Sequence, residues 1–164
     1  MRQLPARLVV NTSPLIHLAE ADFLHLLREA APRVWVPEPV AEEIRAYEAD
    51  DPTARALVTH PWLEVKPVGS VAATILAWNL GAGESAVLAL ATAFPGSTAV
   101  IDDLAGRRCA ETLGVSLHGT VGLVLAAKQA GRIAAARPIL EQLRDRGMYL
   151  SEAVLNRALR WVGE

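Results

Sequence analysis

The chain has 164 residues, a length that predicts one domain with a full hydrophobic core. Apolar residues make up 52% of it and charged residues 21%, which excludes a disordered protein. The net charge of −2 argues against a strongly basic nucleic-acid-binding surface, and the single cysteine, Cys109, excludes a disulfide framework or a cysteine-based metal site.

The sequence also argues against membrane insertion, secretion and a histidine-based metal site. No apolar run reaches the roughly 18 residues of a membrane span. Residues 1–5 lead directly into a strand-like segment and do not resemble a signal peptide. The four histidines lack the spacing of a metal site. We therefore expect a cytoplasmic protein.

Short apolar segments alternate with helical segments along the chain. The expected strands cover residues 7–10, 34–36, 63–65, 98–101 and 115–117. The expected helices cover residues 15–31 with a break near 21–22, 39–47, a short stretch from 52, 71–80, 83–94, 104–113, 120–130, 134–146 and 151–161. Ser13 should cap the first helix ahead of Pro14, Asp22 should cap its second part, and Thr120 should cap the helix that follows it.

This alternation predicts an α/β fold built on a parallel sheet. The strands are apolar throughout and do not alternate with polar residues, so both faces of the sheet should be covered. We expect a single domain over residues 1–164, with a core at about 7–130 and additional helices at about 133–164. The functional site of such a sheet lies at the carboxyl ends of its strands.

Polar residues follow two of the predicted strands. Asn11 comes after the first, and Asp102 and Asp103 come after the fourth. Asp103 directly precedes a helix, so it can serve as a helix cap while Asp102 points at a site, or the two can exchange roles.

Two predicted helices contribute further carboxylates. Glu43 lies beside the apolar stripe of its helix, whereas Glu42 faces water. Glu84 lies on the apolar stripe formed with Val87 and Leu88, where it needs a cation, a metal ion or a cleft. An acidic residue in the first turn of a helix also has a simpler explanation, since the helix dipole favours it there.

These candidates come from four separate segments of one predicted α/β domain. Oxygen ligands without cysteine or histidine suit hard cations such as Mg²⁺ or Mn²⁺. A pair of such ions can generate hydroxide and stabilise phosphodiester cleavage.

At these residues the sequence resembles the PIN-domain nucleases, particularly bacterial toxins of the VapC kind. The matching stretches are residues 9–16, 36–37 with 40–44, 81–91, 101–110 and 119–122, which together cover residues 8 to about 130.

The resemblance implies a three-layer α/β/α sandwich around about five parallel strands. It also implies metal-dependent RNA hydrolysis by a homodimer that a small antitoxin restrains. The acidic positions of the family fall on Asn11, Glu43, Glu84 and the Asp102–Asp103 pair, of which Asp103 has the better spacing. Thr12, Ser13 and Thr120 match hydroxyl residues that support the site.

The sequence departs from the family at the first acidic position, where it has Asn11. An amide oxygen can still bind a metal, but one negative charge is lost and the affinity should fall. We therefore consider two functions. The first is a metal-dependent endoribonuclease, in which Arg107 or Arg108 contacts phosphate. The second is a catalytically weakened module that binds RNA or a protein. A receiver-like phosphoryl-transfer protein fits poorly, because it needs an acid where Asn11 stands.

The C-terminal helices carry several arginines together with Leu155, Leu159 and Trp161. These residues are expected to pack or face solvent, and they offer anchors for a homodimer or antitoxin contact.

Overall fold

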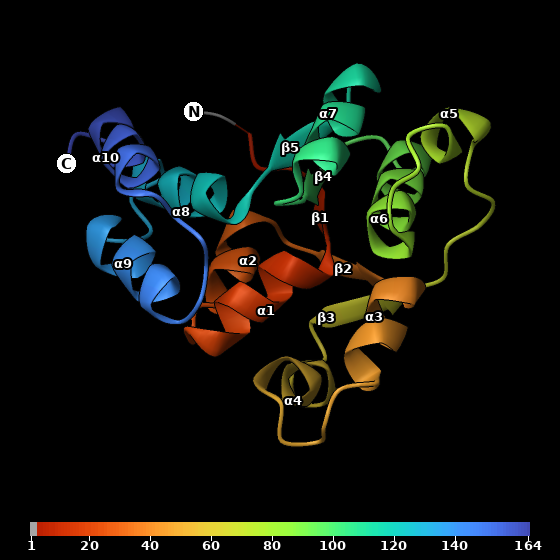
Figure 1. Ribbon diagram of the computed structural model, residues 1–164, viewed down its shortest axis with the longest axis horizontal. Helices are drawn as coiled ribbons and strands as arrows, with labels where there is room; N and C mark the ends of the chain where they lie inside the picture. Colours follow the sequence, from red (N-terminus) through yellow and green to blue (C-terminus); the bar gives the residue numbers. More distant parts are fainter. Residues whose placement is uncertain (1–2) are drawn as a thin grey trace.

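The computed structural model describes residues 3–164. Met1 and Arg2, which belong to the segment that is not expected to be a signal peptide, lie outside the described residues. Its centre is a five-stranded sheet with the order β3-β2-β1-β4-β5 (Figure 1). The strands are β1 (Arg7–Val10), β2 (Val34–Pro37), β3 (Leu63–Lys66), β4 (Ser97–Val100) and β5 (Ser116–His118). Every neighbouring pair is parallel, which confirms the predicted sheet.

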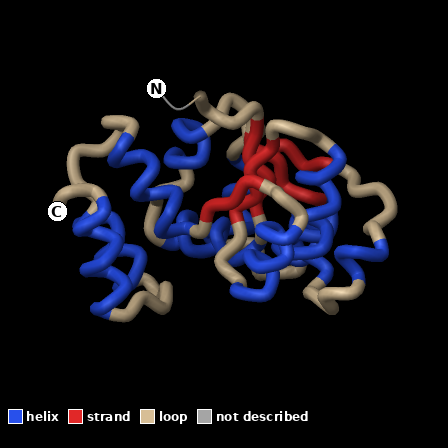
Figure 2. Tube along the Cα trace, turned by 90° about the horizontal axis from the view of Figure 1, so that it is seen from above, coloured by secondary structure: helices blue, strands red, loops and turns tan. Residues whose placement is uncertain are grey.

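Helices connect the strands and cover the sheet (Figure 2). They are α1 (Thr12–Glu20), α2 (His25–Ala30), α3 (Glu38–Arg45), α4 (Pro52–Thr59), α5 (Ala73–Leu76), α6 (Ala82–Ala93), α7 (Leu104–Thr112), α8 (Thr120–Gln129), α9 (Arg137–Asp145) and α10 (Glu152–Trp161). Helix α6 packs on β1, β2 and β4, while α8 packs against α1 and α2. The arrangement is the expected three-layer sandwich.

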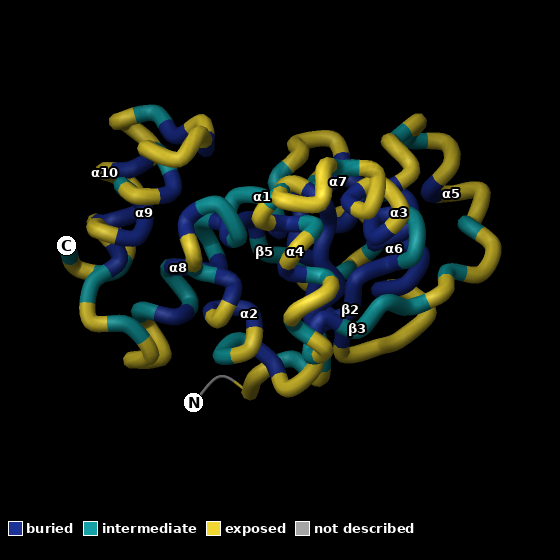
Figure 3. The backbone as a smooth tube through the Cα atoms, turned by 90° about the horizontal axis from the view of Figure 1, so that it is seen from below, coloured by how far each residue is buried: buried dark blue, intermediate teal, exposed yellow. Residues whose placement is uncertain are grey.

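The core confirms that both faces of the sheet are covered. Leu8, Val9 and Val10 of β1 are completely buried, and β4 is buried along its whole length. The buried segments in Figure 3 include the central strands and α6. One hydrophobic cluster extends from Leu8 in β1 to Leu159 in α10, so the C-terminal helices share the core of the sheet.

Helices α9 and α10 pack against α8, and α9 also contacts α1. In Figure 1 the two helices lie at the side of the molecule, away from the strands. Within residues 3–164 no helix is long and apolar enough to cross a membrane.

The start of the first helix differs from the prediction. Helix α1 begins at Thr12, and Asn11 occupies the N-cap position without a capping hydrogen bond from its side chain. Ser13 therefore does not cap the helix. The reason is that the Asn11 side chain is bound elsewhere, as described below, so the chain enters the helix without a side-chain cap.

The predicted break near residues 21–22 is confirmed, but Asp22 does not cap the next helix. Asp22 has a φ of 60°, which turns the chain between α1 and α2. Leu24 occupies the N-cap position of α2.

The helix predicted over residues 71–80 is shortened to the single turn of α5. Asn79 has a φ of 52°, a left-handed conformation that ends the helical path and redirects the chain into α6.

Candidate active site

The predicted site residues lie around the carboxyl ends of β1 and β4, which are neighbours in the sheet. The backbone N–H of Asn11 donates to the carbonyl oxygen of Val100 at 3.0 Å, which ties the two strand ends together. Side chains that follow these strands are therefore held at one edge of the sheet, as the topology predicts.

Asn11 and Glu84 form the innermost contact of the site. The amide Nδ2 of Asn11 donates to Oε1 of Glu84 at 3.0 Å. Asn11 is only 2% exposed, and its Oδ1 is buried without a hydrogen-bond partner. Glu84 thus obtains the partner that its place on an apolar stripe requires, but this partner is a neutral amide and not a cation.

Gly83 makes this close approach of α6 to β1 possible. A Cβ atom at position 83 would lie 2.8 Å from Asn11 Oδ1, which is closer than real Cβ atoms come to such a neighbour. Because Gly83 has no Cβ atom, the first turn of α6 can rest directly on the Asn11 amide.

Glu43 lies on α3 and is bound by hydroxyl groups. Its Oε2 accepts a hydrogen bond from Thr12 Oγ1 at 2.9 Å, and its Oε1 accepts one from the Tyr47 hydroxyl at 3.5 Å. Glu43 is exposed, as Glu42 is, so the prediction from helical periodicity that Glu43 faces inward is wrong. Burial raises the pKa of Tyr47, and the charge of Glu43 raises it further.

Tyr47 is a member of the site that the sequence did not reveal. Its position suggested only a place in the apolar stripe of the helix predicted over residues 39–47, whereas α3 ends at Arg45. The spacing of four residues from Glu43 was the available signal, because residues four apart on a helix are neighbours.

Asp102 is fully engaged with the start of α8. Its Oδ1 accepts from the backbone N–H of Thr120 at 2.7 Å, and its Oδ2 accepts from the Thr120 hydroxyl at 2.6 Å. Thr120 is completely buried and is the first residue of α8, with Gly119 at the N-cap position. The prediction that Thr120 caps its helix is therefore wrong, since Asp102 supplies the acceptor from the loop after β4.

Asp103 caps α7 and lies close to Glu84. Its Oδ2 accepts the N–H of Gly106 at 2.9 Å. A Cβ atom at Gly106 would lie 3.6 Å from this oxygen and 3.4 Å from Cγ of Glu84. The two carboxylate side chains therefore flank one glycine. Asp103 is exposed, whereas Glu84 is half-buried.

Arg107 lies against the backbone of Gly119, beside Asp102. A Cβ atom at Gly119 would overlap the Arg107 guanidinium and would lie 3.1 Å from Asp102 Oδ1. Arg107 is half-buried, whereas Arg108 and Ser13 are exposed. Of the two arginines, Arg107 is thus the one held near the carboxyl edge of the sheet.

The structure does not gather all the predicted carboxylates into one ligand set. Among residues 3–164, no three His, Cys, Asp or Glu side chains are placed to hold one ion. Glu43 is held by Thr12, Glu84 by Asn11 and Asp102 by Thr120. The neutral donors keep the negative charges apart. What the structure does bring together is Glu84 with Asn11, and Asp103 next to them.

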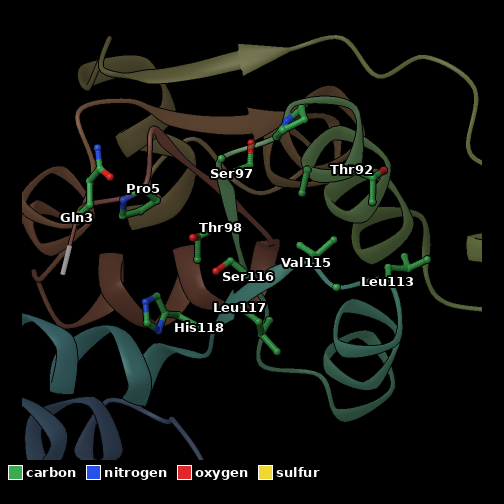
Figure 4. A pocket seen from close by; sticks show the side chains of 14 residues that line it. Gln3, Pro5, Thr92, Ser97, Thr98, Leu113, Val115, Ser116, Leu117 and His118 are labelled. Atoms are coloured by element: carbon green, nitrogen blue, oxygen red, sulfur yellow. The ribbon is translucent and has the colours of Figure 1, made fainter.

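A cavity of about 880 Å³ lies elsewhere, along β4 and β5 (Figure 4). Its lining includes Thr92, Ser97, Ser116 and His118, and none of the predicted site residues. It has no carboxylate among its lining residues, so it lacks the chemistry expected of a metal-dependent site.

Comparison with known proteins adds one finding to this geometry. A family model described as a PIN domain matches residues 7–164, which is nearly the whole chain. No curated protein matches the sequence.

Proposed function

Because the chain belongs to the PIN-domain family, a nuclease-type family, we propose that it is a metal-dependent endoribonuclease. The observation that carries the proposal is the group formed by Asn11, Glu84 and Asp103 at the carboxyl ends of β1 and β4. In parallel α/β sheets, ligands bind at this edge of the sheet.

The donor atoms of this group fit a hard divalent cation. Asn11 Oδ1 is buried against Gly83 without a hydrogen-bond partner, and Glu84 Cγ and Asp103 Oδ2 lie 3.4 and 3.6 Å from the position that a Cβ atom on Gly106 would take. An oxygen-only set of this kind suits Mg²⁺ or Mn²⁺. When bound, the ion would supply a hydroxide nucleophile and stabilise the charge that develops on the phosphate.

The remaining residues would bind and orient the RNA. Arg107, held against Gly119 beside Asp102, would contact a phosphate. Thr12 and Tyr47 fix the carboxylate of Glu43, which faces solvent and would accept a proton during the reaction. Ser13 is exposed next to Thr12 and would contact the substrate.

Cleavage of single-stranded RNA by the purified protein tests this function. We expect Mn²⁺-dependent cleavage that a chelator abolishes, and a loss of about 100-fold or more in Glu84→Gln. Glu42→Gln is the matched control, because it removes an exposed charge one residue from Glu43 and should retain full activity. Cleavage that survives both the chelator and Glu84→Gln would contradict the proposal.

A second function is favoured by the identity of residue 11. With asparagine in place of an acid, the group carries less negative charge than three carboxylates would, so the chain would be a weakened module that binds RNA or a protein without cleaving it. RNA binding by the wild-type protein, without turnover in Mn²⁺, would favour this second function.

We also propose a toxin-like role in the cytoplasm, as a homodimer restrained by a small antitoxin. Support comes from the resemblance of residues 8 to about 130 and from Trp161 and Val154 of α10, which are 74% and 43% exposed. Large apolar side chains that remain exposed on one helix are typical of contact surfaces.

A further inference from the structure

We infer that the surface around Trp35 is a second binding site for single-stranded RNA, separate from the candidate active site. This surface, the Trp35 patch, consists of Arg7, Arg33, Lys66 and Phe94 around the Trp35 ring. The inference takes RNA as the substrate from the proposed function, but it concerns affinity and not cleavage.

Positive charge is concentrated in the Trp35 patch. Three charged groups lie 4.8 to 5.4 Å from the centroid of the Trp35 ring, and they belong to Arg7, Arg33 and Lys66. Glu64 is the carboxylate in contact with them: it accepts two hydrogen bonds from Arg33 and lies 3.2 Å from Lys66. The group therefore keeps two net positive charges, in a chain whose total charge is −2. A local excess of this kind attracts a polyanion in spite of the acidic total.

Two of the three cations are open to a ligand. The side chains of Arg33 and Lys66 are 49% and 32% exposed. Arg7 has an internal task, because its guanidinium donates to the carbonyl oxygens of Phe94 and Pro95 at 3.3 Å. Arg7 thus holds the end of α6 on the sheet, while the other two cations remain available to phosphate groups.

An exposed aromatic ring beside these cations favours RNA over an acidic protein as the ligand. Phe94 is 44% exposed and meets the Trp35 ring edge-on, with 4.9 Å between the centroids. Proteins bind single-stranded nucleic acids by placing cations along the backbone and aromatic rings against the bases. An acidic peptide would use the cations but would have no need of the ring.

A second pair of a cation and an aromatic ring lies at the same edge of the sheet. Arg28 lies over the half-buried ring of Trp62, 5.5 Å from its centroid. Trp62 and Arg33 directly precede the paired first residues of β3 and β2, so they lie next to each other. Glu29 adjoins Arg28 in α2, so this pair extends the aromatic surface without adding net charge.

The Trp35 patch and the candidate active site lie at opposite edges of the sheet. Arg7 begins β1, and Phe94 precedes β4 at the end of α6, so the patch is at the amino ends of these strands. Glu84 lies in the first turn of the same helix, ten residues before Phe94, a distance of roughly 15 Å along the helix axis. An RNA that reaches both places should bind more tightly than one confined to the active site.

Equilibrium binding of a fluorescently labelled single-stranded RNA, measured by anisotropy in chelator, tests the inference. The chelator prevents metal-dependent cleavage, so affinity is measured whether or not the protein is a nuclease. We expect Arg33→Gln/Lys66→Gln to bind about 10-fold more weakly, and the slope of log K against log salt to fall by about 1.4, which corresponds to two lost phosphate contacts. Phe94→Leu keeps an apolar cover on Trp35 but removes the ring, and it should bind about 3-fold more weakly.

Glu64→Gln separates binding from folding, because it should act in the opposite direction. The change removes the carboxylate that competes with phosphate for Arg33 and Lys66, so RNA should bind about 3-fold more tightly. It also removes an ion pair, so tighter binding would not result from a more stable fold. Glu152→Gln is the matched control: it frees Arg144 from a 2.8 Å ion pair in the C-terminal helices and should leave the affinity unchanged.

Three results would overturn the inference. They are unchanged affinity in a folded Arg33→Gln/Lys66→Gln, equal tightening by Glu64→Gln and Glu152→Gln, and equally tight binding of a glutamate-rich peptide with the same charge as the RNA. If the double variant does not fold, Glu64→Gln decides, and affinity that is unchanged or weaker would overturn the inference. The expected binding pattern without cleavage in Mn²⁺ would refute the proposed function alone, whereas cleavage with unchanged binding in every variant would refute the inference alone.

Discussion

At the scale of single residues, the neighbours Asp102 and Asp103 have different partners. Both oxygens of Asp102 are bound by Thr120, whose hydroxyl is completely buried. Asp103 is exposed, caps α7 through one oxygen and flanks Gly106 together with Glu84. The first carboxylate therefore has mainly a structural task, and the second is free to take part in the proposed chemistry.

This difference predicts separate effects of substitution. Asp102→Ala should lower the free energy of unfolding by about 3 kcal/mol, because it removes two charge-assisted hydrogen bonds and leaves the Thr120 hydroxyl unpaired. Asp103→Ala should cost only about 1 kcal/mol, the usual value for a helix cap, while lowering RNA cleavage strongly. Urea denaturation and the cleavage assay measure both quantities. Equal losses of stability in the two variants would refute the assignment.

At the scale of elements, the edge strand β3 is attached to β2 by a charged pair as well as by the backbone. Arg33 donates to both carboxylate oxygens of Glu64, at 3.2 and 2.8 Å, and Lys66 lies 3.2 Å from the same group. Arg7, Arg33 and Lys66 also surround the ring of Trp35, at 4.8, 5.4 and 5.3 Å from its centroid. Glu64 is the carboxylate that pairs with Arg33 and Lys66 in this cluster.

The pKa of Glu64 gives this attachment a defined pH dependence. The hydrogen bonds from Arg33 lower the pKa of Glu64, and Lys66 lowers it further. A lowered pKa means that the stabilisation is complete above the unfolded pKa of about 4.3 and is lost as the pH falls through the lower folded value. Glu64→Gln should therefore melt below the wild type at pH 7, and the difference should disappear near pH 3.

The effect should be small and sensitive to salt, because the Arg33 and Glu64 side chains are 49% and 30% exposed. Melting curves from pH 3 to 7, at low and high salt, measure it. A difference that persists unchanged at pH 3 would show that the carboxylate charge is not its cause.

At the scale of the whole molecule, the proposed homodimer makes α10 the surface to examine. We expect light scattering to give twice the mass of the 164-residue chain at micromolar concentration. Trp161→Ala should shift the protein to monomer, because Trp161 is 74% exposed and can serve as an interface anchor. Arg108→Ala, which changes another exposed residue far along the chain, is the control. A monomeric wild type would refute the dimer.

The overall fold was predictable from the sequence because its signals are local. An apolar strand such as β1 can be recognised from a few consecutive residues. The same holds for a turn residue such as Gly114, which has a φ of 69°. The partners of the site residues are not local. Asn11 and Glu84 are 73 positions apart, Thr12 and Glu43 are 31 apart, and Asp102 and Thr120 are 18 apart. Which side chains meet depends on strand register and helix placement, which no short pattern contains.

The same reason explains the error at Ser13. A hydroxyl residue before a proline is a good cap by local criteria. In the folded chain, however, the helix begins beside Asn11, whose side chain is occupied by Glu84. The long-range contact between Asn11 and Glu84 thus outweighed the local preference for Ser13 as the helix cap.

The close approach at Gly83 has a consequence for any effort to make this protein more thermostable. Replacing a helix glycine with alanine usually adds about 1 kcal/mol, and position 83 lies in the first turn of α6, where such a replacement would look attractive. Here the added methyl group would push the helix away from Asn11 and open the centre of the molecule. Position 83 should therefore be exempt from that strategy.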